Sequence, residues 1–134
     1  MRIAIDSNRY SDLRRGRPEV VEFLSQVAEI HVPLIVLAEQ RAGFAAGTRR
    51  EESERLLNLF LNQAGTFVVL PDQQTTFLYA DLFAYLKARG TPIPTNDLWI
   101  AALAVQHSLV LFDRDSDFDR LPQLARVGPL NGVE

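Results

Sequence analysis

Residues 94–112 read PTNDLWIAALAVQHSLVLF, a stretch that predicts a helix followed at once by a strand. The polar opening at 94–97 is typical of a helix cap, and the residues from Leu98 to His107 are apolar on nearly every side. A helix that is apolar all round has to be buried, so we expect 98–107 to be the central helix of the domain. The apolar run from Leu109 to Phe112 then predicts a strand.

The rest of the chain alternates short apolar runs with longer amphipathic stretches. The short runs predict strands at 2–5, 29–32, 66–70 and 109–112, with a weaker signal at 126–127. Helices are expected behind Asp6, at 18–28, from Pro33 to Gly43 or Gly47, from a Thr48 cap to about Gly65, and from Asp72 to Arg89 with Phe77 on the apolar side. Strands that alternate with helices form a mostly parallel sheet covered on both faces. We therefore expect one domain, residues 1–134, with a three-layer α/β/α fold.

Composition excludes several classes of protein. The chain has no cysteine, so any metal would be held by oxygen atoms or by His31 and His107. The apolar runs are too short to span a membrane, and Asp6 interrupts the opening run before it could serve as a signal-peptide core. We therefore expect a cytoplasmic protein with no membrane partner.

The charge pattern bears on nucleic-acid binding. A net charge of −3 argues against a protein that coats nucleic acid through bulk positive charge. The basic side chains are nearly all arginine, with Lys87 the one lysine, and arginine suits bidentate phosphate contact. A cluster that either places phosphates or forms a salt-bridged surface follows the first acid: Arg9, Arg14, Arg15 and Arg17.

Four acids lie at strand ends or in apolar helices and not on stretches expected to form solvated surface. Asp6 ends the first strand, Glu39 interrupts an apolar helix, Asp97 begins the buried helix and Asp115 follows the fourth strand. Parallel sheets bind ligands at the carboxyl ends of their strands, so these acids can converge on one cleft. Clustered carboxylates repel one another unless a cation compensates them, and oxygen ligands suit Mg²⁺ or Mn²⁺.

Each acid also has an ordinary alternative role. Asp6 and Asp97 can stabilise helix N-termini, Glu39 can face water, and Asp115 can be one of several loop acids. Ser7 and Asn8 can cap a helix or orient a ligand behind the acids. Both histidines and Trp99 are expected to be structural, with Trp99 in the core.

Motifs of other enzyme classes are absent from the sequence. It contains no phosphate-binding loop, dinucleotide-binding glycine pattern, nucleophile elbow or HExxH zinc motif. A phosphoaspartate receiver domain would need a partner lysine, and Lys87 lies inside a predicted helix.

Four segments resemble the PIN-domain family, in order and along essentially the whole chain. Residues 3–8 (IAIDSN) resemble its opening strand with an aspartate and a small polar pair, and residues 37–39 (LAE) resemble its Ala-Glu helix. Residues 94–102 (PTNDLWIAA) are similar to its Asn-Asp-x-x-Ile-Ala-Ala segment, the most specific of the four. Residues 111–118 (LFDRDSDF) resemble its closing strand and Thr-Arg-Asp-x-Asp-Phe turn, with Asp113 where the family usually has Thr or Ser.

The resemblance implies an Mg²⁺- or Mn²⁺-dependent endoribonuclease of the VapC toxin type. Its acidic metal site would consist of Asp6, Glu39, Asp97 and Asp115, with Asp113 a further candidate ligand and Ser7, Asn8 and Asn96 behind them. Its partners would be an RNA substrate, first of all tRNA, a small DNA-binding antitoxin and a second copy of the chain. The alternatives are a PIN-like RNA- or protein-binding module without nuclease activity, and a structure-specific DNA nuclease, whose relatives carry extra elements.

Overall fold

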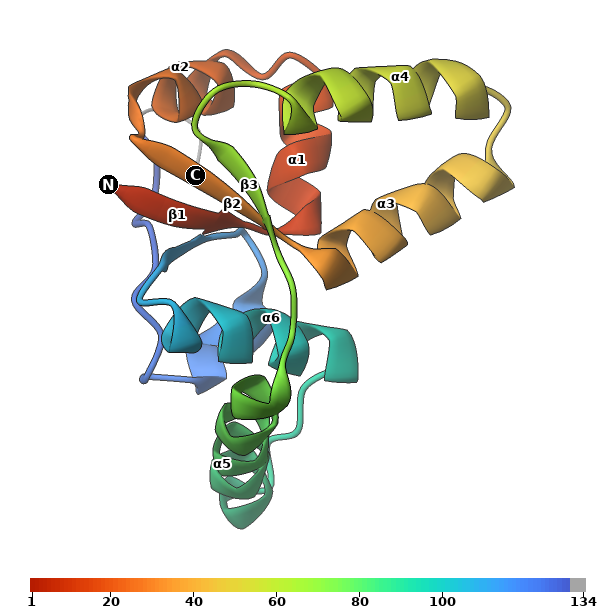
Figure 1. The fold of residues 1–134 in the computed structure, drawn as a ribbon. Helices are drawn as coiled ribbons and strands as arrows, with labels where there is room; N and C mark the ends of the chain where they lie inside the picture. Colours follow the sequence, from red (N-terminus) through yellow and green to blue (C-terminus); the bar gives the residue numbers. More distant parts are fainter. Residues whose placement is uncertain (131–134) are drawn as a thin grey trace.

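Four parallel strands form the middle layer of the structure, a computed structural model that describes residues 1–130 (Figure 1). They are β1 (Arg2–Ile5), β2 (Glu29–Pro33), β3 (Thr66–Val69) and β4 (Val110–Phe112), in the spatial order β3-β2-β1-β4. β1 therefore pairs with β2 on one side and with β4 on the other. The strand order reverses at β1, which is where a doubly wound sheet opens a crevice for ligands.

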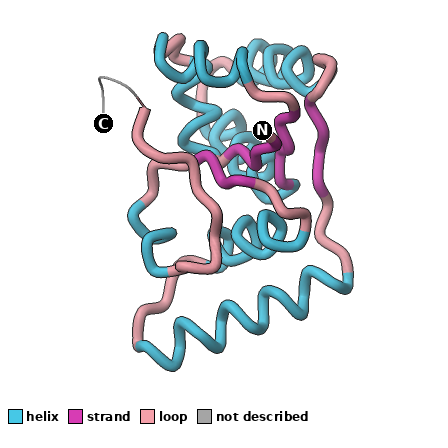
Figure 2. The backbone as a smooth tube through the Cα atoms, turned by 90° about the vertical axis from the view of Figure 1, so that its left-hand side faces the viewer, coloured by secondary structure: helices cyan, strands magenta, loops and turns pink. Residues whose placement is uncertain are grey.

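Helices cover both faces of this sheet, as the three-layer expectation required. They are α1 (Ser7–Arg14), α2 (Pro18–Gln26), α3 (Leu34–Ala46), α4 (Arg50–Leu61), α5 (Gln73–Arg89) and α6 (Thr95–Gln106), followed by the 3₁₀ helix η1 (Ser116–Arg120). α1, α2 and α4 lie on one side of the strands and α5 and α6 on the other, while α3 and α4 project together as an arm (Figure 1). The view turned by 90° also places the strands between helices (Figure 2). No helix among residues 1–130 has the length and apolar character needed to cross a membrane.

The expected central helix is buried, but it begins earlier than expected. Ile100, Ala101, Ala102 and Leu103 of α6 are fully buried, which confirms the prediction from its all-round apolar pattern. The helix begins at Thr95 and not at Leu98, because the polar residues assigned to the cap form its first turn. Asp97 consequently lies inside the helix.

Two further details differ from expectation. Thr48 does not cap α4, which begins at Arg50 and carries acids in its first turn. His31 lies in β2, inside the strand expected at 29–32, with its ring stacked on Phe67 at 5.2 Å between centroids. Phe77 was expected on the apolar side of α5 but is 66% exposed, because α5 buries Leu82 and Leu86 instead.

The weak strand signal at 126–127 corresponds to a single bridge beside β4. Leu111 pairs with Arg126 in parallel orientation, and the amide N–H of Leu111 donates to Ala125 O at 2.8 Å. The chain after η1 thereby returns to the outer side of β4, where it brings Arg126 close to the end of that strand.

Candidate metal and nuclease site

Two of the acids are placed by the ends of neighbouring strands. Asp6 follows β1 and Asp113 follows β4, and the amide N–H of Asp6 donates to Phe112 O at 3.0 Å. Both carboxylates are buried, with Asp6 4% and Asp113 5% exposed. Asp6 is the N-cap residue of α1, yet its side chain makes no capping hydrogen bond, so the ordinary role weighed for it is not the one it has.

Helices bring two more acids to the same edge. α3 begins directly after β2, and its contacts with α6 place Glu39 near the first turn of α6, where Asp97 lies. A helix N-terminus favours a carboxylate through its dipole and free amides. Asp97 is only 8% exposed, so it is more buried than a surface capping residue would be.

Mutual repulsion and burial perturb these carboxyls. Burial is the main cause that raises the pKa of Asp6 to about 7, and repulsion from Asp97, Glu39 and Asp113 adds to it while the Ser7 amide opposes it. Burial likewise raises the pKa of Asp97 to about 7, with repulsion from Asp115 and Asp117 the next causes. Two carboxyls that titrate near neutrality on one edge indicate a functional site.

The loop after β4 contributes two further acids. One oxygen from each of Asp97, Asp115 and Asp117 lies within 4.8 Å of the others. The Asp115 side chain also accepts from the Asp117 amide at 2.9 Å, which turns both residues back toward α6 at the start of η1. Sequence reasoning did not choose Asp117, although its spacing of two residues from Asp115 was the available signal.

Glu39 shows that the donor set suits a hard cation. Burial raises the pKa of Glu39, although a hydrogen bond from Asn96 opposes the effect. Its Oε1 atom is buried with no hydrogen-bond partner in the described chain. A buried carboxylate oxygen left without a donor beside other carboxylates fits an Mg²⁺ or Mn²⁺ ligand, because these ions prefer oxygen.

Asp113 has a partner of its own. Both of its carboxylate oxygens accept hydrogen bonds from Arg126 Nε and Nη2, at 2.8–3.1 Å. Arg126 also donates to Asp115 O at 3.2 Å and pairs with Asp119. Burial raises the pKa of Asp113 while Arg126 opposes the rise. The arginine, which the sequence did not single out, therefore holds the acid-bearing loop against β4.

The residues expected behind the acids divide into two groups. Asn96 reaches Glu39, and the backbone amide of Ser7 reaches Asp6. The hydroxyl of Ser7 accepts from Gln40 Nε2 at 2.8 Å, so Gln40, also missed in the sequence, joins α3 to α1. Asn8 is exposed, and no described contact joins it to the acids.

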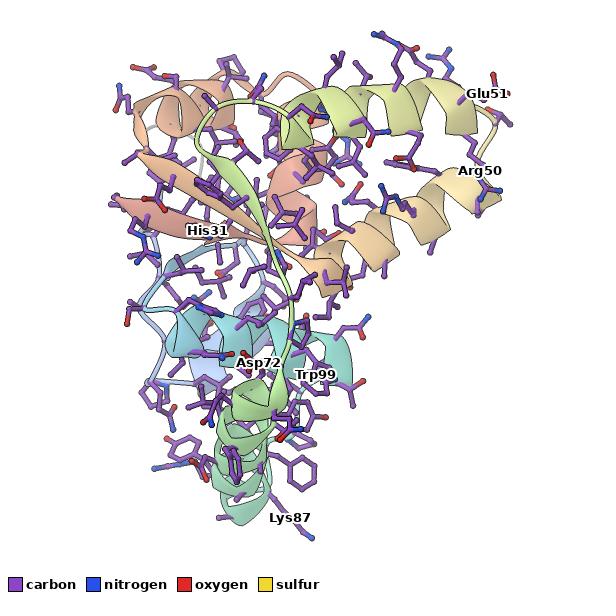
Figure 3. All side chains as sticks on the ribbon, viewed as in Figure 1. His31, Arg50, Glu51, Asp72, Lys87 and Trp99 are labelled. Atoms are coloured by element: carbon purple, nitrogen blue, oxygen red, sulfur yellow. The ribbon has the colours of Figure 1, made fainter. Side chains whose placement is uncertain are left out.

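The remaining candidates lie outside the acidic edge. His31 Nε2 is 2.8 Å from Glu29 Oε1, and His107 lies at the opposite end of α6 from Asp97. Trp99 is half-buried and packs against Tyr79 at 4.6 Å between ring centroids (Figure 3).

Comparison with known proteins identifies the family and the fold of the chain. A family model of the PIN domain matches residues 3–124. Ribonuclease VapC2 of Rickettsia felis is 30% identical over 105 residues, which cover 78% of this chain and 77% of that protein. Ribonuclease VapC1 of Haemophilus influenzae strain R2866 is 30% identical over 125 residues, with 90% and 92% covered. The solved structure of VapBC-1 from nontypeable Haemophilus influenzae matches with a TM-score of 0.85 and 29% identity, over 95% of this chain and 97% of that one.

Proposed function

Since the chain belongs to the PIN-domain family, we propose that it is a metal-dependent endoribonuclease and the toxin of a toxin–antitoxin pair. The observation that supports this most is the convergence on Asp97 of carboxylates from the end of β1, from α3, from the loop after β4 and from η1. Its relatives VapC1 and VapC2 are named ribonucleases, which supports RNA as the substrate.

The acids would hold Mg²⁺ or Mn²⁺ through oxygen alone. We propose Asp6, Glu39, Asp97 and Asp115 as the catalytic and metal-binding set, joined by Asp117 on the distances of the structure. Asp113 is a weaker candidate because Arg126 occupies both of its oxygens. A divalent cation there would supply the positive charge that activates water and stabilises the developing charge in phosphodiester hydrolysis.

The chain's own residues prepare the site before RNA arrives. In the metal-free protein, Asp6 and Asp97 each hold a proton for part of the time near neutral pH, which relieves their repulsion. Asn96 orients the Glu39 carboxylate, and Arg126 fixes the loop that carries Asp115. The positions of Glu39 and of the loop that carries Asp115 are therefore set by hydrogen bonds from the chain's own side chains.

Two protein partners accompany this proposal. A small DNA-binding antitoxin is supported by the similarity to VapBC2 of Rickettsia felis, solved bound to a DNA fragment from its promoter, and to VapBC-5 of Mycobacterium tuberculosis, a member of the VapBC family of toxin–antitoxin systems. A second copy of the chain is supported by apolar side chains left exposed along edge strand β3 and the outer side of α5, namely Phe67, Val68, Leu70, Phe77 and Phe83. Large apolar side chains left exposed on an edge strand and on the helix that follows it are typical of an interface.

The test is mapping of RNA ends after induction of the protein without its antitoxin. We expect the wild type to arrest growth and to generate new 5′ ends at few sites, first in tRNA, while Asp6→Asn and Asp97→Asn do neither. The control is Asp81→Asn, an exposed acid on α5. Identical RNA ends in the wild type and both site variants would leave the inert RNA- or protein-binding module as the better account.

A further inference from the structure

A second charged centre lies behind the acid-bearing loop, and it is dominated by arginine. Asp12 of α1 is completely buried, and Arg114 donates to it from Nε at 2.9 Å and from Nη2 at 3.3 Å. Arg9 is 3.4 Å from the same carboxylate, while Arg15 and Arg17 approach it at 3.7 and 3.8 Å. Glu19 also lies 3.9 Å from Arg17, so two carboxylates face four guanidinium groups and the centre keeps positive charge.

An open cavity of about 630 Å³ adjoins this centre. Its charged lining consists of Arg9, Arg17, Arg114, Arg126, Asp113 and Asp119. The cavity and the Asp12 centre together hold five arginines (Arg9, Arg15, Arg17, Arg114 and Arg126) against four carboxylates (Asp12, Glu19, Asp113 and Asp119), a positive surplus in a chain whose net charge is −3. A concave surface with a surplus of one charge sign focuses its field on a ligand of opposite sign.

Most of these arginines are already held in place. Arg114 is fixed by Asp12 and Arg126 by Asp113, so little side-chain entropy remains to be lost on binding. Arg17 differs from them, because its side chain is 44% exposed and its carboxylate neighbours, Asp12 and Glu19, lie at 3.8 and 3.9 Å. It is the arginine best able to turn toward an incoming anion.

The cavity and the acidic edge share one residue. Asp113 lines the cavity and also repels Asp6 and Asp97 in the acidic cluster. The acids and the arginines therefore meet at the Asp113–Arg126 pair. Neighbouring phosphates of a nucleic acid strand suit this arrangement, since one can lie at the acids while another lies among the arginines.

We propose that this cavity binds a backbone phosphate of the RNA strand that flanks the phosphodiester at the acidic site, with Arg17 and Arg114 as its main contacts. The inference rests on the proposed ribonuclease function and adds to it the residues that position the strand. Phosphate contact of this kind fixes register without reading sequence.

The direct test measures RNA binding apart from cleavage. The probe is a short fluorescein-labelled oligouridylate, and the parent protein carries Asp97→Asn so that the probe stays intact. We expect Arg17→Glu in that parent to weaken binding on the order of tenfold and to reduce the slope of log K against log salt by about 0.7 for one lost phosphate contact. Arg17→Lys keeps the charge and should retain most of the affinity.

The matched control makes the same charge change far from the cavity. Arg50 lies at the outer end of the arm formed by α3 and α4 (Figure 3), and Arg50→Glu should leave oligouridylate affinity unchanged. In the cleaving protein, Arg17→Glu should raise KM for total tRNA with Mn²⁺ about tenfold and leave kcat within about twofold.

Each outcome decides between the two claims. If oligouridylate affinity depends on Arg17 but the wild type cuts no RNA, the proposed nuclease activity is wrong and the proposed phosphate site stands. If Arg17→Glu cleaves RNA with the KM of the wild type and binds oligouridylate as tightly as the parent, the proposed phosphate site is wrong and the proposed nuclease activity stands. The inference is also wrong if the Asp97→Asn parent binds no oligouridylate. It is wrong as well if Arg17→Glu weakens binding to the antitoxin and leaves binding to oligouridylate unchanged.

Discussion

Asp97 is the residue on which the site depends most, because it interacts with acids from α3, from the loop after β4 and from η1. Its pKa and that of Asp6 are raised from 3.8 to about 7 in the metal-free fold. From about pH 4 to pH 7 the folded protein keeps protons that the unfolded chain releases, so the free energy of unfolding falls as pH rises. The metal-free protein should therefore be more stable at pH 5 than at pH 8.

We predict that Asp97→Asn removes part of this pH dependence. At pH 8 in EDTA the variant should be more stable than the wild type by on the order of 1 kcal/mol, because one buried charge is gone. Mn²⁺ should raise the melting temperature of the wild type at pH 8 and leave that of Asp97→Asn nearly unchanged. Thermal unfolding followed by circular dichroism measures both effects, with Asp81→Asn as the control. A wild type whose stability increases from pH 5 to pH 8 in EDTA would contradict the assigned burial.

Asp113 and Asp115 are neighbours in the sequence with different surroundings. Asp115→Asn should abolish most Mn²⁺ binding in titration calorimetry, whereas Asp113→Asn should retain it. Asp113→Asn should instead change the free energy of unfolding by less than about 1 kcal/mol, because the loss of the ion pair with Arg126 is offset by the removal of a buried charge. If Asp113→Asn proves the more damaging change to metal binding, the roles assigned to the two acids are reversed.

At the level of elements, hydrophobic periodicity predicted most of the fold. The apolar runs located all four strands within one or two residues, because buried parallel strands have little polar surface. Boundaries were less predictable, as at Thr95, where polar side chains suit both a cap and an exposed first turn. The prediction for Phe77 was wrong because the hydrophobic periodicity of a helix does not by itself show which face of α5 packs against α6.

The candidate site was predictable where an acid follows an element directly. Asp6 and Asp97 could be placed from the strand and helix that precede or contain them. Arg126 and Gln40 could not, because their partners Asp113 and Ser7 lie 13 and 33 residues away, and long-range hydrogen bonds leave no periodic signal. Asp113 looked like a ligand from its position alone, and its pairing needs three-dimensional information.

The burial of α6 contributes to the stability of the fold, and truncation of a buried side chain measures that contribution. Ile100 is fully buried in the centre of this helix, so Ile100→Ala should lower the free energy of unfolding by about 2–5 kcal/mol through lost contacts and a cavity. Leu59→Ala on the exposed side of α4, where Leu59 is 55% exposed, should change it by less than about 0.5 kcal/mol. Urea unfolding distinguishes the two, and equal losses would mean that α6 is not the central helix.

Across the whole molecule, the exposed apolar segment from β3 to α5 predicts self-association. Phe77→Asp introduces a charge where we propose a second copy to pack, so it should shift sedimentation equilibrium from dimer toward monomer. Leu59→Asp, an equally drastic change on α4, should leave the dimer intact. A wild type that sediments as a monomer at every concentration tested would remove the second copy from the proposal.

The position of β4 beside β1 has a consequence for the timing of synthesis. Asp6 leaves the ribosome well before its neighbouring strand β4 and the acids that follow β4. A nascent chain that has emerged only as far as α5 lacks Asp97, Asp115 and Asp117 altogether. The acidic edge therefore cannot assemble until β4 and η1 have emerged, so a shorter nascent chain carries no complete acidic site beside the ribosome that makes it.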